Sequence, residues 1–397
     1  MRRLNYKKRS AVSQSGTIQI LKFEFRNCYA NSREQVAMGT TDKILVVQTS
    51  FLGDAVLTTP LLAALRRLFP QAELSVLCTP QAKSIFVDSP NVDTIITDDK
   101  RGEGRGLAGM WRMAKVLRSR GFKIALSPHK SLRSALLLFL AGIPCRIGFR
   151  QSAGWFFYHR RVDRDPTSHD VIRNLSLLRP LGIAPAECRG DLRVETEPRA
   201  CEDVGHLFRS LGIRREGVIF GINPGSVWPT KRWAAEGYAE LMAHLTRKYC
   251  CQILLFGAPE DQKIAARIQE LSGNLGINLV GRMDLQGLAC ALEWCDLFIT
   301  NDSGPMHIAV ARGVPVVSIF CATTPALGFY PYSSRAVVIE KDLPCRPCGS
   351  HGGRRCPLGT EDCMRLVTAE DVMRGVEGLL NSGPASVDQH LPEFITV

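Results

Sequence analysis

Three polar segments carry the side chains that could do chemistry, and each of them follows a run of apolar residues. They are Thr49–Asp54, Asn223–Trp233 and Asn301–His307. A buried strand followed by a glycine-containing turn and a helix is a common way for an α/β domain to present amides to a phosphate. The three segments therefore indicate a phosphorylated ligand, bound where parallel strands end.

The third segment sits between a strand and a short helix. Ser303 and Gly304 add little bulk to the turn, and Pro305 suits the first helical turn, where its missing N–H is not needed. The free amides of this turn could hold a diphosphate. A simple capped helix has the same pattern, because Asp302 and Ser303 both favour capping positions. His307 could contact phosphate or sugar, or serve only in packing.

The first segment ends in Gly53 and Asp54. Glycine permits a close approach of the backbone, and the aspartate follows at the sheet edge. With an ordinary pKa of about 3.9, an aspartate is ionised at neutral pH and can take a proton from an alcohol. Asp54 is therefore a candidate general base, although it could also simply cap the following helix.

The second segment combines a Gly225–Ser226 turn with Lys231 and Arg232. Either cation could neutralise the charge that develops on a departing diphosphate. The alternative is a solvated basic loop. Two prolines and two tryptophans constrain the loop more than solvation requires, which favours a function.

Weaker candidates accompany these segments. Glu260 could bind a ribose hydroxyl, and Met283 could contact a nucleobase. A basic set could meet acidic groups of a second substrate or form a solvated helix face. Its members are His129, Lys130, Arg133, Arg146 and Arg150.

The fourteen cysteines, in a chain without an export signal, indicate reduced thiols that lie mostly in the core. Four of them share a Gly- and Arg-rich loop with the spacing C-x2-C-x7-C-x6-C, namely Cys345, Cys348, Cys356 and Cys363. Such thiolates could bind zinc or an iron–sulfur cluster. Because the second pair lacks the x2 spacing of strong zinc motifs, we assign no metal and leave the role of the loop open.

Two similar halves of alternating strands and helices position the three segments. In the first half we predict strands at 43–48, 73–78, 94–97 and 124–126, and helices at 55–69, 107–119 and 132–141. In the second half we predict strands at 218–222, 252–256, 278–280 and 297–300, and helices at 234–246, 261–272 and 285–294. The fold class is therefore α/β, with two Rossmann-like parallel-sheet domains.

The pattern loosens into charged sequence around 192–215, which indicates a domain boundary. We predict a basic and disordered N-terminal extension (1–41), a first domain (42–205), a second domain that includes the Cys-rich loop 343–364 (206–382), and a flexible tail (383–397). Met38 precedes the first strand, so translation could start at Met1 or at Met38.

Half of the net charge of +12 lies at the N-terminus, because residues 1–38 hold eight Lys or Arg against two Glu. The remainder suits phosphorylated substrates or an anionic membrane surface, and no aromatic-basic pattern indicates nucleic acid. The longest apolar run, Ala135–Ala141, is far shorter than the roughly 20 residues of a membrane span. The class is therefore an enzyme-sized α/β protein without a membrane span.

Four motifs occur in an informative order. They are VVQTSFLGDAVLTTP (46–60), NPGS with KRW (223–226, 231–233), FGAPED (256–261) and NDSGPMH (301–307). With them the chain resembles the family 9 glycosyltransferases, from about Asp42 to Leu380. Within that family it looks most like the ADP-heptose:lipopolysaccharide heptosyltransferases, in particular heptosyltransferase II.

This resemblance implies a GT-B fold, with the acceptor bound by the first domain, the nucleotide sugar by the second, and inversion without a metal or other cofactor. It also implies roles for the residues. Asp54 matches the base, Ser226 and Lys231 the phosphate contacts, Glu260 a ribose contact, Met283 an adenine-side contact, Asp302 a sugar-hydroxyl contact, and Ser303, Gly304 and His307 the diphosphate lining.

The implied reaction transfers L-glycero-D-manno-heptose from ADP-heptose to a lipid A–Kdo acceptor that already carries the first heptose. The implied place is the cytoplasmic face of the inner membrane of a Gram-negative bacterium, with peripheral association. The segment Ser127-Pro128-His129 departs from the Asn-Ser type expected of heptosyltransferase II, so acceptor identity stays open. The alternatives are heptosyltransferase I, another nucleotide-sugar transferase, or a non-catalytic protein that binds nucleotide or metal.

Overall fold

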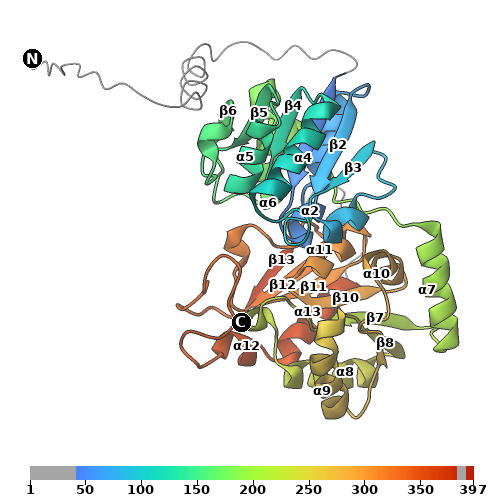
Figure 1. Ribbon diagram of the computed structural model, residues 1–397. Coiled ribbons are helices and arrows are strands. Elements are labelled where there is room, and N and C mark those ends of the chain that lie inside the picture. The colour runs from blue at the N-terminus through green and yellow to red at the C-terminus, as the bar shows by residue number, and fades with distance from the viewer. Residues whose placement is uncertain (1–41, 382–389) are drawn as a thin grey trace, which may run out of the picture. The chain divides into compact units, whose positions relative to one another are not determined.

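The computed structural model describes residues 42–381 and 390–397. The predicted extension 1–41, and residues 383–389 of the predicted tail, lie outside the described residues. The described chain contains two parallel sheets, each flanked by helices (Figure 1). The prediction of two α/β sheet domains is confirmed.

The first sheet has six strands in the order β3-β2-β1-β4-β5-β6. They are β1 (Lys43–Gln48), β2 (Glu73–Cys78), β3 (Thr94–Thr97), β4 (Ile124–Ser127), β5 (Cys145–Phe149) and β6 (Arg160–Val162). The helices of this lobe are α2 (Leu52–Val56), α3 (Thr59–Leu68), α4 (Gly106–Arg120), α5 (Leu132–Leu140) and α6 (Asp170–Ser176). β1 lies inside the sheet and its last five residues are buried, as expected for a parallel strand covered on both faces.

The second sheet has seven strands in the order β13-β12-β11-β10-β7-β8-β9. They are β7 (Val218–Asn223), β8 (Cys251–Leu255), β9 (Ile277–Asn278), β10 (Leu297–Asn301), β11 (Val316–Phe320), β12 (Ala336–Glu340) and β13 (Glu393–Thr396). The accompanying helices are α7 (Pro198–Ser210), α8 (Ala235–Lys248), α9 (Gln262–Ser272), α10 (Leu285–Leu292), α11 (Gly304–Ala311), α12 (Asp362–Arg365) and α13 (Ala369–Asn381).

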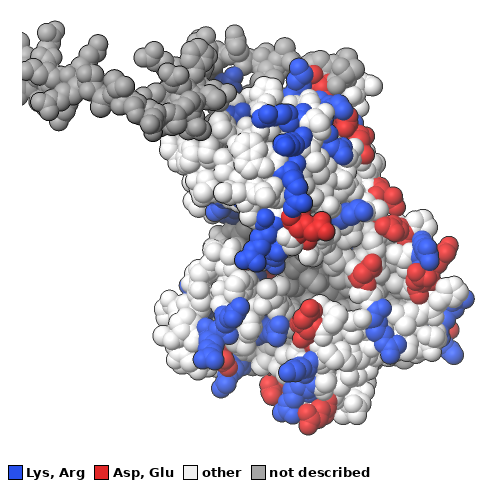
Figure 2. Space-filling view, in the orientation of Figure 1, with Lys and Arg blue, Asp and Glu red and all other residues white. Residues whose placement is uncertain are grey.

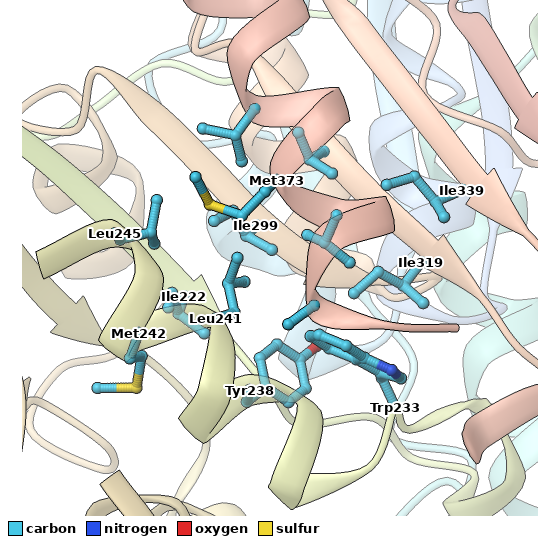
Figure 3. Close-up of a cluster of buried hydrophobic side chains, with 14 of the residues drawn as sticks. Ile222, Trp233, Tyr238, Leu241, Met242, Leu245, Ile299, Ile319, Ile339 and Met373 are labelled. Atoms are coloured by element: carbon cyan, nitrogen blue, oxygen red, sulfur yellow. The ribbon is translucent and has the colours of Figure 1, made fainter. Parts of the chain in front are cut away.

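A buried apolar cluster joins the second sheet to α8 and α13. Figure 3 shows Leu241 of α8 and Met373 of α13 among the strand residues Ile299 and Ile319. Trp233, which is 1 % exposed, closes one end of this cluster, and its indole N–H donates to the Val367 carbonyl at 2.9 Å. The core thereby fixes the end of the loop that follows β7.

Three predictions about the elements are wrong. The helix predicted at 55–69 is two helices, α2 and α3, because Pro60 lies in the first turn of a new helix. The charged stretch 192–215 contains α7, and the predicted boundary after residue 205 falls inside it. The end of the predicted flexible tail forms β13, which pairs in parallel with β12.

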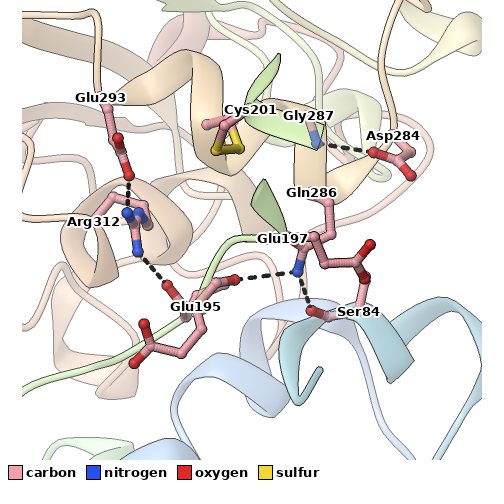
Figure 4. The surroundings of a disulfide bond; sticks show 11 residues. Ser84, Glu195, Glu197, Cys201, Asp284, Gln286, Gly287, Glu293 and Arg312 are labelled. Atoms are coloured by element: carbon pink, nitrogen blue, oxygen red, sulfur yellow. Dashed lines mark hydrogen bonds and ion pairs between the residues drawn. A yellow bond between two sulfur atoms is a disulfide. The ribbon is translucent and has the colours of Figure 1, made fainter. Parts of the chain in front are cut away.

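The expectation of reduced thiols is wrong for one pair, Cys201 of α7 and Cys290 of α10, which form a disulfide. Their separation of 89 residues hid the pairing, because only the packing of α7 on α10 brings them together. Near this bond the Gln286 side chain donates to the Ser84 and Glu195 carbonyls at 2.7 and 3.2 Å (Figure 4). Ser84 belongs to the first lobe, so this corner of α10 links the two lobes.

None of the helices within 42–381 combines the length and the apolarity that a membrane span requires.

Asn301, the last residue of β10, holds the loop after β7 in place. Its carboxamide oxygen accepts from the Trp233 backbone N–H at 2.9 Å and the Tyr238 hydroxyl at 3.0 Å. Its nitrogen donates to the Pro224 carbonyl at 2.8 Å. The side chain is fully buried, so its partners would find no water if it were removed.

We therefore expect Asn301→Ala to lower the free energy of unfolding by about 3 kcal/mol, since several buried polar groups lose their partners. Urea denaturation of the variant and the parent measures this change. Asn381→Ala, at an exposed position, serves as the control and should change the unfolding free energy by less than about 0.5 kcal/mol. Equal effects of both substitutions would contradict this role of Asn301.

Candidate active site

One cavity of about 120 Å³ brings the three predicted polar segments together. Its lining comes from both lobes: Phe51, Gly53 and Asp54 from the first, and residues of the second that include Ser226, Trp228, Lys231, Asp302, Ser303, Gly304, His307, Phe329, Ser350 and His351. Seven of the nine predicted catalytic and donor-site residues therefore line a single space, and Glu260 and Met283 do not.

Asp54 lies in the first turn of α2, and its carboxylate accepts from the Phe51 backbone N–H at 3.2 Å. Asp54 is not the N-cap, which is Phe51, but as the third residue of α2 it caps that N–H, and it also lines the cavity. Burial raises the pKa of Asp54 to about 6, and the negative charge of Asp170 adds to the shift. A carboxylate whose pKa lies this close to neutrality is well matched to general base catalysis.

The N-terminal turns of α2 and α11 meet beside this carboxylate. A β-carbon built on Gly53 would lie 2.9 Å from Cδ2 of His307, and one built on Gly304 would lie 3.1 Å from the Leu52 side chain. His307 is buried, and burial lowers its pKa to about 3, so the ring is neutral. Its Nδ1 atom has no hydrogen-bond partner among the described residues.

Lys231 and Asp302 form an ion pair on the other side of the cavity, with 2.6 Å between Nζ and Oδ2. Asp302 also accepts from the Thr323 hydroxyl at 2.7 Å. Both side chains are largely shielded from solvent, which strengthens their attraction. The ammonium group is therefore fixed close to the N-terminus of α11, which begins directly after Ser303.

The turn at Ser226 is shaped by two residues outside the cavity lining. Arg232 donates to the Ser226 carbonyl at 2.9 Å through Nε and pairs with Asp261 at 3.5 Å. A β-carbon on Gly225 would overlap the Asp261 carboxylate, because they would be 2.1 Å apart. Of the two cations predicted in this loop, Lys231 faces the cavity and Arg232 supports the turn.

The Cys-rich loop forms part of the cavity wall, which the sequence did not indicate. Thr230 exchanges hydrogen bonds with Gly353: its hydroxyl donates to the carbonyl at 3.0 Å and accepts from the N–H at 2.8 Å. Two residues earlier, the His351 ring packs against Phe51 of the first lobe, with 5.5 Å between ring centroids. The aromatic side chains at these two positions were the feature of the sequence that could have indicated this contact.

The four cysteines of this loop are neighbours, because burial raises the pKa of Cys363 and the charges of Cys348, Cys345 and Cys356 each add to this shift. In the described part of the chain, however, no three of their sulfurs lie within 4.8 Å of one another. Within the described residues, the trio whose ligand atoms lie within 4.8 Å of one another is Glu240, His244 and Glu370, on α8 and α13. Cys363 lies at the inner end of the cysteine group, buried against the core of the second lobe. Hydrogen bonds from backbone amides, that of Glu361 foremost, lower the pKa of Cys356.

Glu260 and Met283 lie farther along the same sheet edge. Glu260 is exposed after β8, and Met283 contributes to a separate cavity next to α7 and α10. Their loops are neighbours, because a β-carbon on Gly281 would lie 3.3 Å from Cα of Pro259. Since β8 and β9 follow β7 in the sheet, an extended nucleotide could run from the cavity toward these loops.

The five residues of the predicted basic acceptor set lie in different environments, some inside the first lobe and others on its surface or near the cavity. Arg133 pairs with buried Asp98 at 3.1 Å, and Arg146 is buried with Nε donating to the Phe157 carbonyl at 2.8 Å. These two guanidinium groups serve the interior of the lobe. Arg150 is exposed and pairs with Asp163 at 3.0 Å.

His129 and Lys130 lie closer to the reacting groups. His129 contacts the Thr49 hydroxyl at 3.2 Å, and burial together with Lys100 lowers its pKa to about 4. Burial also lowers the pKa of Lys130, while the charges of Asp170 and Asp54 oppose this shift. Lys130 therefore lies close enough to Asp54 for the two charges to interact.

Helix α6 was not predicted, yet it ties the base to the second lobe. The Asp170 backbone N–H donates to the Gly328 carbonyl at 2.8 Å, and Arg173 donates to the Leu327 carbonyl at 2.8 Å. Asn174 donates to the Leu57 carbonyl at 3.1 Å, directly after α2. Leu327 lines the cavity, so α6 bridges both of its walls.

Known proteins share this sequence and architecture. The chain is 26% identical over 343 residues to lipooligosaccharide heptosyltransferase 2 of Campylobacter jejuni (serotype O:6), which covers 85% of this chain and 99% of that protein. It is 27% identical over 307 residues to lipopolysaccharide heptosyltransferase 2 of Escherichia coli K12, covering 75% and 88%.

Solved structures agree. A family 9 glycosyl transferase from Veillonella parvula superposes with a TM-score of 0.79 at 26% identity, covering 87% of this chain and 99% of that one. The E. coli ADP-heptose lps heptosyltransferase II superposes with a TM-score of 0.68 at 24% identity, covering 85% and 98%. The predicted GT-B architecture is thereby confirmed.

The sequence profile described as "Glycosyltransferase family 9 (heptosyltransferase)" matches residues 110–356, more than half of the chain. With the cavity and the fold in agreement, this protein is a glycosyltransferase and belongs to family 9, the heptosyltransferase family.

Proposed function

We propose that this enzyme transfers L-glycero-D-manno-heptose from ADP-heptose, with inversion, to the lipopolysaccharide inner core. The acceptor in this proposal is lipid A–Kdo that already carries the first heptose. The observation that carries the proposal is the single cavity shared by Asp54, Lys231 and the N-terminus of α11. The relatives named as heptosyltransferase 2 support the choice of the second heptose transfer, and the name of the solved E. coli ADP-heptose lps heptosyltransferase II supports the choice of donor.

The first chemical step we assign is proton removal by Asp54. The acceptor hydroxyl gives its proton to this carboxylate while its oxygen attacks the anomeric carbon of the heptose. The bond between that carbon and the diphosphate oxygen breaks at the same time, and ADP leaves. Attack from the face opposite to the leaving group inverts the configuration, and holding both reactants in one cavity makes the reaction effectively intramolecular.

The leaving diphosphate gains negative charge, and the groups opposite Asp54 are suited to stabilise it. Lys231 supplies a full positive charge, and the free amides at Ser303 and Gly304 supply the positive end of a helix dipole. We assign Asp302 to a heptose hydroxyl, His307 and Ser226 to the diphosphate, and Glu260 and Met283 to the nucleoside. His129, Lys130 and Arg150 are assigned to the acidic acceptor.

The lipid-linked acceptor implies a place of work at the cytoplasmic surface of the inner membrane, with peripheral attachment. The lobe built on the sheet β1–β6 is assigned to the acceptor, and the lobe built on the sheet β7–β13 to the nucleotide sugar. Each lobe contributes its own side of the cavity.

A transfer assay with product mass analysis tests the proposal. Purified enzyme is given ADP-heptose, UDP-sugars or GDP-sugars, and a lipid A–Kdo acceptor that bears no heptose or one heptose. We expect a gain of one heptose only from ADP-heptose, and on the acceptor that already carries one. Product on the unmodified acceptor alone would indicate heptosyltransferase I, and transfer from another nucleotide sugar would overturn the donor assignment.

The candidate base predicts a pH dependence. Activity requires ionised Asp54, whose pKa of about 6 lies above its ordinary value, so kcat/KM should fall as the pH decreases through about 6. Asp54→Asn should lower kcat by roughly 10²- to 10⁴-fold. ADP binding, measured by calorimetry, should persist in this variant. Retained turnover would exclude Asp54 as the base.

A second variant tests the cause of the shift. Asp170→Asn removes a negative charge that raises the pKa of Asp54, so the acidic limb of the profile should move to lower pH. Arg164, released from its ion pair with Asp170, would act in the same direction. Asp163→Asn, at an exposed position in the same lobe, is the matched control and should leave the limb in place.

Lys231 should matter for the departure of ADP more than for folding. We expect Lys231→Ala to lower kcat by roughly 10²- to 10³-fold, because an electrostatic contact to the transition state is lost. Lys231→Arg keeps the charge and should restore part of the rate. Steady-state kinetics with ADP-heptose measure both, and a loss confined to KM would show that Lys231 only binds the donor.

A further inference from the structure

The first lobe carries a long stretch of sequence without a negative charge. Residues 104–162, from two residues before α4 to the end of β6, contain twelve Lys or Arg and no Asp or Glu. The whole chain has a net charge of +12, so this stretch alone contains as much excess charge as the entire protein. None of the cavity-lining residues belongs to it, and the proposed reaction uses only three of its residues.

Helix α4 exposes apolar side chains together with these cations. Its buried face consists of Gly109, Met110, Ala114 and Leu117. Along the edge of this buried face, Leu107 is 71 % exposed and Trp111 is 50 % exposed, four residues apart. Lys115 continues the same stripe one turn later and is also exposed. Leu107 and Trp111 thus form a contiguous exposed apolar patch beside a cation, and such a patch marks an interaction surface.

Neighbouring elements extend this face. α5 packs beside α4 on one side of the first sheet and exposes Leu132 (Figure 1). The short helical turn after β5 exposes Trp155 and Phe156, and the Arg161 guanidinium lies 4.7 Å from the Trp155 ring centroid. The turn also contacts α5, so these apolar side chains belong to the same lobe surface.

The charge distribution is visible on the molecule. Figure 2 shows Lys and Arg side chains in a column over α4, with uncharged surface beside them over α5. Cations attract an anionic surface, and Trp and Leu side chains gain free energy when they enter the boundary between lipid head groups and acyl chains. Tryptophan in particular concentrates at that boundary. Cations in a stretch without anions, beside exposed Trp and Leu side chains, fit an anionic lipid bilayer. A protein partner would more often require charges of both signs.

We infer that the face formed by α4, α5 and the turn Trp155–Phe157 docks on an anionic lipid bilayer. Trp111 and Leu107 enter the interface, and Lys115 and its basic neighbours pair with lipid phosphates. The benefit of docking rests on the proposed function, because docking would bring the lobe that carries Asp54 to a lipid-anchored acceptor. The binding itself can be measured without any transfer reaction.

The test uses full-length protein and flotation with vesicles. Vesicles of phosphatidylglycerol and phosphatidylethanolamine provide the anionic surface, and phosphatidylcholine vesicles provide the neutral one. We expect binding to the anionic vesicles, weakened by added salt, and little binding to neutral ones. The double variant Leu107→Ser/Trp111→Ser should lower the bound fraction at least fivefold, as should Lys115→Glu. Both should keep the parent's melting temperature within a few degrees, because the changed side chains are exposed.

Leu271→Ser is the matched control, since Leu271 is an exposed leucine on α9 of the other lobe. It should bind vesicles as the parent does. Docking is overturned if the double variant binds anionic vesicles as well as the parent does. It is also overturned if the substitutions leave vesicle binding unchanged and alter only the sedimentation coefficient, because the face would then bind a second copy of the chain.

A paired activity assay separates this inference from the proposed function. The double variant should transfer heptose normally to a deacylated, water-soluble acceptor but at least fivefold more slowly to the same acceptor in vesicles. Equal rates on both acceptors would overturn the docking role. If the parent binds vesicles but transfers to neither acceptor, docking stands and the proposed function fails.

Discussion

The contact between the N-terminal turns of α2 and α11 is the constraint on which the rest of the site depends. Each turn presents a glycine to the other helix, and a β-carbon at Gly53 would lie only 2.9 Å from the His307 ring. The same contact needs a neutral imidazole, and burial provides it by lowering the pKa of His307 to about 3. Because the two backbones approach so closely, a carboxylate from one lobe and helix amides from the other share one small cavity.

Helix α6 turns this contact into a defined electrostatic environment. It is bonded on one side to the Gly328 carbonyl of the second lobe and on the other to the Leu57 carbonyl beside α2. Its buried Asp170 is held by Arg164 and Arg173 and still raises the pKa of Asp54. The element that links the two lobes therefore also adds to the rise in the pKa of the candidate base, whose main cause is burial.

The sequence predicted most of the strands and the gathering of the motifs, but not the environment of single side chains. β2 and β3 have the predicted bounds, because short apolar runs between polar turns can hardly form anything else. α7 was missed, since its exposed face is charged and its apolar positions are few. The internal positions of the Arg133 and Arg146 side chains could not be predicted, because residue type does not tell whether a guanidinium group faces solvent or bonds to an oxygen inside the lobe. The same holds for Asn301, whose partners come from a loop far away in sequence.

The Cys-rich loop contributes to the cavity wall through its backbone and His351, whereas its cysteine sulfurs, all of them in the described part of the chain, do not line the cavity. Backbone hydrogen bonds fix the loop to the cavity wall: Gly353 is bonded to Thr230, and the Cys348 N–H donates to the Ala322 carbonyl at 2.9 Å. Those bonds bring His351 against Phe51 of the opposite lobe. Any chemistry at the cysteine sulfurs would therefore reach the reaction through the position of His351 and of the Lys231 side chain, which a β-carbon on Gly352 would approach to 3.0 Å.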